Sequence, residues 1–93
     1  MKVRWSETAL AEIDEIFSYI YEYSRSAASA VVDRIEDLTT LLEQFPHAGH
    51  LTDEPDVRVL SVIRYPYLIF YNVDLVTDEV VILHVRHGRR EQP

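Results

Sequence analysis

The sequence contains no cysteine, which excludes disulfide bonds and thiolate metal sites as supports of the fold. This composition is compatible with a reducing, intracellular compartment. Nothing in the 93 residues approaches the ~18 consecutive apolar residues of a membrane span. The N-terminus, MKVRWSETALAEID, carries acidic residues where a signal peptide would need an apolar run. We therefore expect a soluble, cytoplasmic protein with no membrane partner.

The sequence also lacks the short motifs that mark common catalytic and cofactor sites. It has no P-loop, no glycine-rich dinucleotide fingerprint, no zinc-ligand spacing and no nucleophile elbow. His47 and His50 lie three positions apart in a loop that also holds three acidic residues, Asp53, Glu54 and Asp56. They could form a weak metal site, but we interpret them as solvated loop histidines. We expect neither a cofactor nor a bound metal.

Basic residues are scarce, with nine Lys and Arg against 16 Asp and Glu and a formal net charge of -7. The imbalance lies in residues 1–56, which hold twelve acids and four bases, whereas residues 57–93 hold four acids and five bases. Proteins that bind the nucleic-acid backbone draw much of their affinity from Lys and Arg. The composition therefore argues against direct DNA binding by this chain alone. Its basic end suits contact with an acidic partner or a phosphate.

Two amphipathic helices are predicted in the first half of the chain. The first spans residues 6–23, with Ser6 as its N-cap, and the second begins at Ser24 or Ser26 and stops at Pro46. The short link between them predicts an antiparallel helical hairpin. Apolar residues recur at helical spacing, namely Leu10, Ile13, Phe17 and Ile20 in the first helix and Ala28, Val31, Ile35, Leu38, Leu42 and Phe45 in the second. We expect most of this stripe to be buried against a sheet, specifically Ile13, Phe17, Ile20, Val31, Ile35, Leu38 and Leu42.

The second half, from residue 57 to residue 90, is rich in β-branched and aromatic residues, which is typical of β-strands. Breaks at 63–66 and 74–78 divide it into a three-stranded meander. Residues 2–5 alternate and predict a further short strand, and residues 46–56 form one long loop. The predicted architecture is a single α+β domain over residues 1–93. An N-terminal strand precedes an antiparallel α-hairpin, which packs on one face of a small antiparallel sheet. The second sheet face is also apolar, which indicates a partner site.

In the last predicted strand, Val81, Leu83 and Val85 should alternate with Ile82, His84 and Arg86. The strand ends in a polar cluster of His84, Arg86, His87, Arg89 and Arg90. A histidine with two arginines could supply acid–base and phosphate-stabilising groups for RNA cleavage. The alternative is a solvated C-terminal tail.

Five groups of residues occur in order over nearly the whole chain. They are Trp5 with 9–16 (W-x3-A-L-x2-I-x2-I), Pro46 with Gly49 (P-x2-G), 57–60 (V-R-x-L), 65–71 (Y-P-Y-x-I-x-Y) and 87–90 (H-G-R-R). Together they resemble the RelE/ParE toxin family of bacterial toxin–antitoxin systems. Within that family the sequence is more similar to the ParE branch.

Resemblance to ParE implies the toxin of a type II system with a role in plasmid stabilisation. Such a toxin inhibits DNA gyrase and is held inactive, in a toxin–antitoxin hetero-oligomer, by a ParD-like antitoxin. The RelE branch implies instead a ribosome-dependent mRNA endoribonuclease. That branch tends to be basic and uses arginines. The position of one of those arginines, earlier in the sheet, corresponds here to about Ile63, and Arg64 is only adjacent to it. His50 stands where the loop motif often has arginine, and the C-terminal tyrosine has no counterpart. The displaced sheet arginine and the missing tyrosine, together with the net charge of -7, argue against nuclease activity, whereas His50 assigns neither branch. A non-toxic interaction module with the same fold is the third hypothesis.

The resemblance and the polar cluster together predict three sets of site residues. Contact with the target is expected from Arg86, His87, Arg89 and Arg90. If the chain is a nuclease, its catalytic residues are expected to be His87, Arg89 and Arg90. Antitoxin binding is expected at Trp5, Leu60, Tyr67, Ile82 and His84. We expect the antitoxin to insert an amphipathic helix into a hydrophobic groove, to follow a sheet edge in part, and to carry basic residues.

Overall fold

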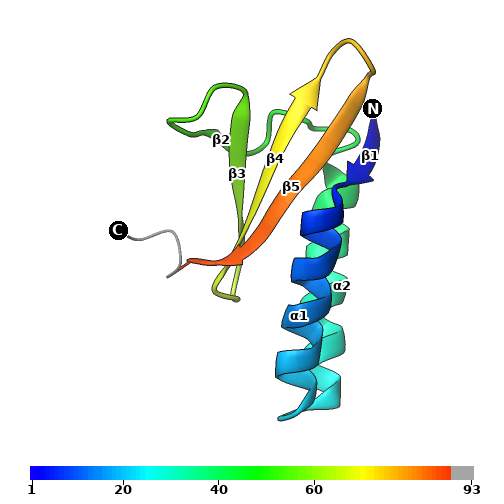
Figure 1. The fold of residues 1–93 in the computed structure, drawn as a ribbon, viewed down its shortest axis with the longest axis vertical. Coiled ribbons are helices and arrows are strands. Elements are labelled where there is room, and N and C mark those ends of the chain that lie inside the picture. Colours follow the sequence, from blue (N-terminus) through cyan, green and yellow to red (C-terminus); the bar gives the residue numbers. More distant parts are fainter. Residues whose placement is uncertain (89–93) are drawn as a thin grey trace.

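Two helices pack against one face of a five-stranded sheet in the computed structural model of the chain, which describes residues 1–88 (Figure 1). The predicted residues Arg89 and Arg90 therefore lie outside the described part. In chain order the elements are β1 (Lys2–Trp5), α1 (Glu7–Tyr21), α2 (Arg25–Leu41), β2 (His50–Leu51), β3 (Val57–Val62), β4 (Tyr67–Asp74) and β5 (Glu79–His87). The strand order across the sheet is β1-β5-β4-β3-β2. Neither helix has the length and apolar character needed to cross a membrane.

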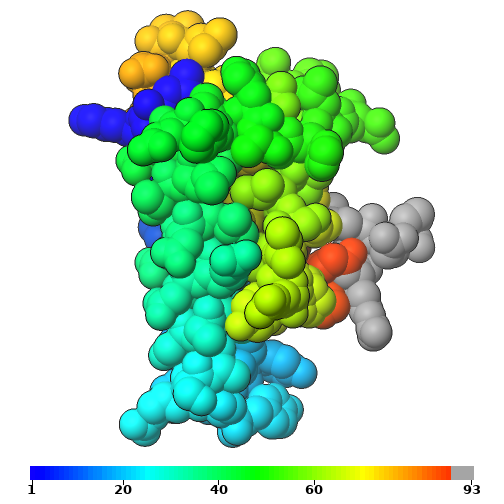
Figure 2. Space-filling model, turned by 180° about the vertical axis from the view of Figure 1, so that it is seen from behind, coloured from blue at the N-terminus to red at the C-terminus, as the bar shows by residue number. Residues whose placement is uncertain are grey.

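Each helix begins at a serine N-cap. The Ser6 hydroxyl accepts a hydrogen bond from the Ala9 N–H at 3.0 Å, and the Ser24 hydroxyl accepts one from the Ala27 N–H at 3.1 Å. The two helices run antiparallel and extend past one end of the sheet (Figure 1). From the opposite side, Figure 2 shows α2 running along the length of the molecule. The predicted helical hairpin is confirmed, with Ser24 as the cap of its second helix.

The core forms between the hairpin and the sheet. From the helices, Val31, Ile35 and Leu42 are buried, and Ile13, Ile20 and Leu38 pack half-buried against the core. The sheet contributes fully or almost fully buried residues, namely Val62, Tyr67, Ile69, Tyr71, Val80, Ile82 and Val85. Six of the seven helical residues expected in the core therefore contribute to it.

Three apolar residues of the predicted stripes lie outside the core, and one of them, Phe17, was expected inside it. On α1, Ala9 is fully buried, whereas Leu10 is 53% exposed and Phe17 lines a shallow groove between the helices with Leu10 and Val32. Leu10 and Phe17 are seven positions apart, so they share one side of the helix, about a quarter turn from Ala9. Phe45 is exposed because α2 ends at Leu41, after which the chain no longer follows the helical spacing.

The sheet is mixed, whereas the sequence predicted an antiparallel one. The meander of β3, β4 and β5 is antiparallel as expected, but β1 pairs with β5 in parallel, from Lys2 opposite Glu79 to Trp5 opposite Ile82. The chain reverses direction an even number of times between β1 and β5, which makes the two strands parallel. A short strand, β2, also forms in the predicted loop and pairs with β3.

A β-bulge in β5 changes which side chains share a face. Phe70 lies opposite His84 whereas Tyr71 lies opposite Ile82, so Leu83 is the extra residue. The predicted alternation is therefore wrong beyond this point. Val85 joins Ile82 in the core, on the face that the helices cover. His84 and Arg86 belong to the opposite face, which we call the outer face of the sheet.

Candidate functional site

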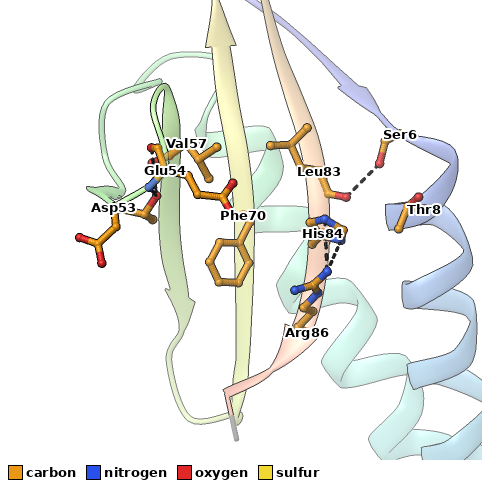
Figure 3. Close-up of a pocket in the computed structure, with 10 residues that line it drawn as sticks. Ser6, Thr8, Asp53, Glu54, Val57, Phe70, Leu83, His84 and Arg86 are labelled. Atoms are coloured by element: carbon orange, nitrogen blue, oxygen red, sulfur yellow. Dashed lines mark hydrogen bonds between the residues drawn. The ribbon is translucent and has the colours of Figure 1, made fainter. Parts of the chain in front are cut away.

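The outer face carries a pocket with a volume of about 500 Å³ (Figure 3). Its floor is apolar and consists of Val57, Phe70 and Leu83, all of which are half-buried. The remaining lining residues are polar or charged, namely Ser6, Thr8, Thr52, Asp53, Glu54, His84 and Arg86. The pocket thus spans β3, β4 and β5, with acidic side chains at the β3 side and a histidine and an arginine at the β5 side (Figure 3).

The β5 side of the pocket is organised by a carboxylate from α1. β1 ends at Trp5, so beyond Ile82 the edge of β5 has no strand beside it. Two α1-side residues occupy that edge instead. The Ser6 hydroxyl donates to the Leu83 carbonyl at 3.1 Å, and Glu12 Oε1 accepts from the Val85 N–H at 3.0 Å. Side chains thus continue the hydrogen bonding that a strand would otherwise supply.

The same Glu12 carboxylate pairs with the basic residues of the outer face. Its Oε1 lies 3.2 Å from His84 Nδ1, and its Oε2 lies 3.5 Å from Arg86 Nε. The Arg86 guanidinium also lies against the His84 ring, with Nη2 at 3.2 Å from Nδ1 and 3.3 Å from Nε2. One negative group therefore offsets the positive charge at this end of the pocket. This arrangement suits binding to a protein surface better than gripping a phosphate.

Removal of the Glu12 side chain is expected to destabilise the C-terminal half of β5, which contains Val85. Glu12→Ala should cost ~1–3 kcal/mol because it leaves the partly buried Val85 N–H without its acceptor. Glu12→Gln retains an acceptor oxygen and should cost less. Urea unfolding followed by circular dichroism would compare them, with exposed Glu22→Ala as a control. Equal costs for the alanine and glutamine variants would contradict the assigned role of the Val85 hydrogen bond.

The loop that leads to the acidic side of the pocket is anchored by Tyr71. Its hydroxyl donates to the Pro46 carbonyl at 2.8 Å and accepts from the Gly49 N–H at 2.8 Å. Arg58 Nη1 donates to the Gly49 carbonyl at 2.8 Å, which secures the start of β2. The expected P-x2-G motif, Pro46 and Gly49, thus bridges the loop to β4. His50, which follows it, is exposed.

Burial raises the pKa of the Tyr71 hydroxyl above its ordinary value, and the Gly49 N–H and the charge of Arg58 oppose this rise. Folding stability is therefore expected to fall as the pH rises above about 10, the ordinary pKa of tyrosine. In the interval between the two pKa values, the unfolded chain has lost this proton while the folded chain retains it, so unfolding is favoured. Tyr71→Phe should remove this component. Urea unfolding between roughly pH 8 and 11 would test it; parallel profiles for the two proteins would contradict it.

The structure separates the predicted target-binding residues. Arg86 lines the outer-face pocket, but His87 lies on the other face of β5, with its ring 5.6 Å from the Tyr67 ring in an edge-on arrangement. His87 lines a second groove, of about 670 Å³, between α1 and the ends of β4 and β5. The described residues of the basic cluster therefore do not form one patch.

Of the five residues predicted to bind an antitoxin, His84 lines the outer-face pocket. Tyr67 and Ile82 are buried in the core, and Trp5 and Leu60 pack half-buried against it. These four residues belong to the helix-covered side of the sheet, because cross-strand pairing places them on the core face. Ile82 is fully buried and does not reach the surface, whereas Tyr67 lines a groove between α1 and the ends of β4 and β5.

Sequence reasoning did not single out the outer-face residues Glu12, Phe70, Asp53 and Glu54 as one site. For Glu12 a signal was present, since an acidic residue three positions after Ala9 and four before Ile16 falls within the apolar stripe of α1. For the other residues, their proximity depends on the register of the sheet and on the path of the loop after β2.

The family profile described as "ParE toxin of type II toxin-antitoxin system, parDE" matches residues 3–92. The Y4kP protein of Sinorhizobium fredii is 33% identical over 92 residues, which cover 99% of this chain and 93% of that protein. Toxin RelE2 of Caulobacter vibrioides is 33% identical over 90 residues, which cover 96% of this chain and 97% of that protein.

Solved structures show the same fold. The chromosomal ParDE toxin–antitoxin system from P. aeruginosa contains a chain that matches with a TM-score of 0.82 at 27% sequence identity, covering 94% of this chain and 95% of that chain. A chain of the intact E. coli RelBE toxin–antitoxin complex matches with a TM-score of 0.69 at 18% identity, covering 92% and 94%. The latter likeness concerns the fold alone.

Proposed function

Because the chain belongs to the ParE toxin family and is the toxin of a type II toxin–antitoxin system, we propose that it inhibits DNA gyrase and is neutralised by a ParD-like antitoxin. The family expected from the sequence motifs is thereby confirmed. The proposal adds the target and the kind of antitoxin, and it places the action of the toxin in the cytoplasm. The match to the ParE profile over residues 3–92 supports it.

The pairing of Arg86 with Glu12 is the observation that favours a protein target over RNA cleavage. Cleavage of RNA needs cationic groups positioned on the phosphate where charge develops. Arg86 is the one arginine among residues 1–88 that lines the outer-face pocket, and its guanidinium is 3.5 Å from a carboxylate. Arg58 is likewise engaged, with the His47 and Gly49 carbonyls. The net charge of -7 points in the same direction.

For target contact we retain the basic end of the chain, Arg86, His87, Arg89 and Arg90, as a proposal. Protein-binding corners of this kind contribute charge and packing and do not require the planar fork of arginine. Replacement of Arg89 or Arg90 by lysine should therefore largely preserve toxicity. If either arginine grips a phosphate, the lysine variant should fail almost as badly as the alanine variant.

The direct experiment compares two purified assays. The chain, freed of antitoxin, is added to DNA gyrase in a supercoiling assay and to programmed ribosomes in an mRNA-cleavage assay. We expect inhibition of supercoiling and intact mRNA. Cleavage of mRNA without an effect on gyrase would overturn the gyrase proposal and move the chain to the nuclease hypothesis. No effect in either assay would favour the non-toxic interaction module.

His87→Gln separates the same two hypotheses at the level of one side chain. As a packing residue against Tyr67, His87 should tolerate glutamine with a loss of stability but little loss of gyrase inhibition. A general acid or base would lose ~100-fold or more in cleavage rate. The measurement is toxin activity per folded molecule, with the folded fraction taken from a thermal melt. A loss of that size in mRNA cleavage would refute the packing role.

A further inference from the structure

We propose that the outer-face pocket receives a segment of the antitoxin that carries a large apolar side chain next to an arginine or lysine. This inference rests on the proposed neutralisation by an antitoxin and specifies where and by which chemistry it occurs. The apolar side chain lies over Phe70 and Leu83, and the cationic group meets Asp53 and Glu54 at the rim.

The floor of the pocket supports the apolar part of this proposal. Val57, Phe70 and Leu83 come from three adjacent strands and remain half-exposed, on a face that neither helix covers. An exposed apolar surface rimmed by polar residues is typical of a protein-binding site. A hollow of about 500 Å³ accommodates a few side chains of one segment, as in the binding of short amphipathic segments by grooves.

The distribution of charge around the pocket supports the cationic part. Asp53 and Glu54 are exposed, and neither carboxylate forms an ion pair with any residue of 1–88. At the opposite side, Glu12 already offsets Arg86. The rim that is available to a partner is therefore negative. An arginine suits this negative rim best. The face of its planar guanidinium stacks on an aromatic ring such as Phe70, while the N–H groups at the edge of the guanidinium bind carboxylates.

The same charges disfavour two other occupants. A nucleic acid would bring its phosphates against Asp53 and Glu54. A second copy of this chain, docked through the same face, would bring two negative rims together, in a protein with a net charge of -7. Like charges that face each other across an interface suppress association. An oppositely charged, partly apolar segment has neither penalty.

The test measures binding of the purified product of the adjacent antitoxin gene to the full toxin chain by surface plasmon resonance at several salt concentrations. The double variant Asp53→Asn with Glu54→Gln removes the rim charge and keeps the side-chain size. We expect about tenfold weaker binding at low salt and a smaller salt dependence of the association rate. Phe70→Ala should weaken binding about 30-fold or more, mainly through faster dissociation.

The matched control is Asp33→Asn with Glu36→Gln, which neutralises one aspartate and one glutamate on the exposed surface of α2, outside the pocket. It should bind as the unmodified chain does. Equal affinities for the rim variant and this control would overturn the inference, even if Phe70→Ala fails to fold. If the unmodified chain does not bind the antitoxin at all, neutralisation itself, and not only its location, is refuted.

Discussion

Replacement of Ile35 by alanine is expected to lower the free energy of unfolding by ~2–5 kcal/mol. Ile35 is fully buried in the middle of α2, where it packs into the core between the hairpin and the sheet. The substitution removes buried carbon atoms and leaves a cavity that the surrounding side chains fill only in part. A domain of this size has a total stability of roughly 5–15 kcal/mol. One substitution would therefore consume a large share of it.

Urea unfolding followed by circular dichroism measures this loss. Arg34→Ala is the control, since it changes the neighbouring, exposed position of the same helix and should alter stability by no more than about 0.5 kcal/mol. A loss below about 1 kcal/mol for Ile35→Ala would mean that α2 is not held on the sheet by this side chain.

Replacement of Gly49 by alanine is expected to cost ~2–5 kcal/mol, because it combines overpacking with the loss of a buried hydrogen bond. A Cβ atom at Gly49 would lie 2.7 Å from the Val59 carbonyl oxygen and 2.8 Å from both Cε1 and the hydroxyl oxygen of Tyr71. Backbone and a buried ring form these contacts, so neither neighbour yields easily. Movement of the loop away from Tyr71 would break the hydrogen bond from the Gly49 N–H.

The chain offers a matched control in its other glycine. At Gly88, an added Cβ would meet only the Pro66 carbonyl oxygen, at 3.7 Å, which is an ordinary contact distance. Gly88→Ala should therefore be close to neutral. Thermal melts of both variants would compare them, and a similar loss for the two would show that crowding around Gly49 is not the cause.

The sequence predicted the hairpin and the meander because helical and strand periodicity are local properties. Ile35 and Leu42 recur at helical spacing, and the turns at 63–66 and 75–78 lie where polar or proline-containing segments interrupt the apolar runs. The caps at Ser6 and Ser24 were predictable for the same reason. These elements, and the core that they build, depend little on distant parts of the chain.

The site was less predictable because its geometry depends on one extra residue. The bulge at Leu83 moves Val85 into the core and leaves His84 and Arg86 on the outer face, and strict alternation does not anticipate it. The bulge lies next to the point at which β1 ends. Beyond it, Glu12 accepts the hydrogen bond from the Val85 N–H at the edge of β5. Such a three-way arrangement of strand, bulge and helix is a tertiary property, absent from any short window of sequence.

The parallel pairing of the first and last strands has a consequence for the folding of this chain during its synthesis on the ribosome. The Ser6 hydroxyl and the Leu83 carbonyl that it binds are 77 positions apart in the chain. Every residue of β1 pairs with β5, so β1 can join the sheet only after β5 has been synthesised. Contacts between such distant residues form late and slowly. During synthesis the N-terminal strand and hairpin emerge with their apolar faces uncovered. The nascent chain therefore cannot complete its sheet, or the outer-face pocket, until β5 has left the exit tunnel, so the end of translation sets the earliest time at which the fold can form.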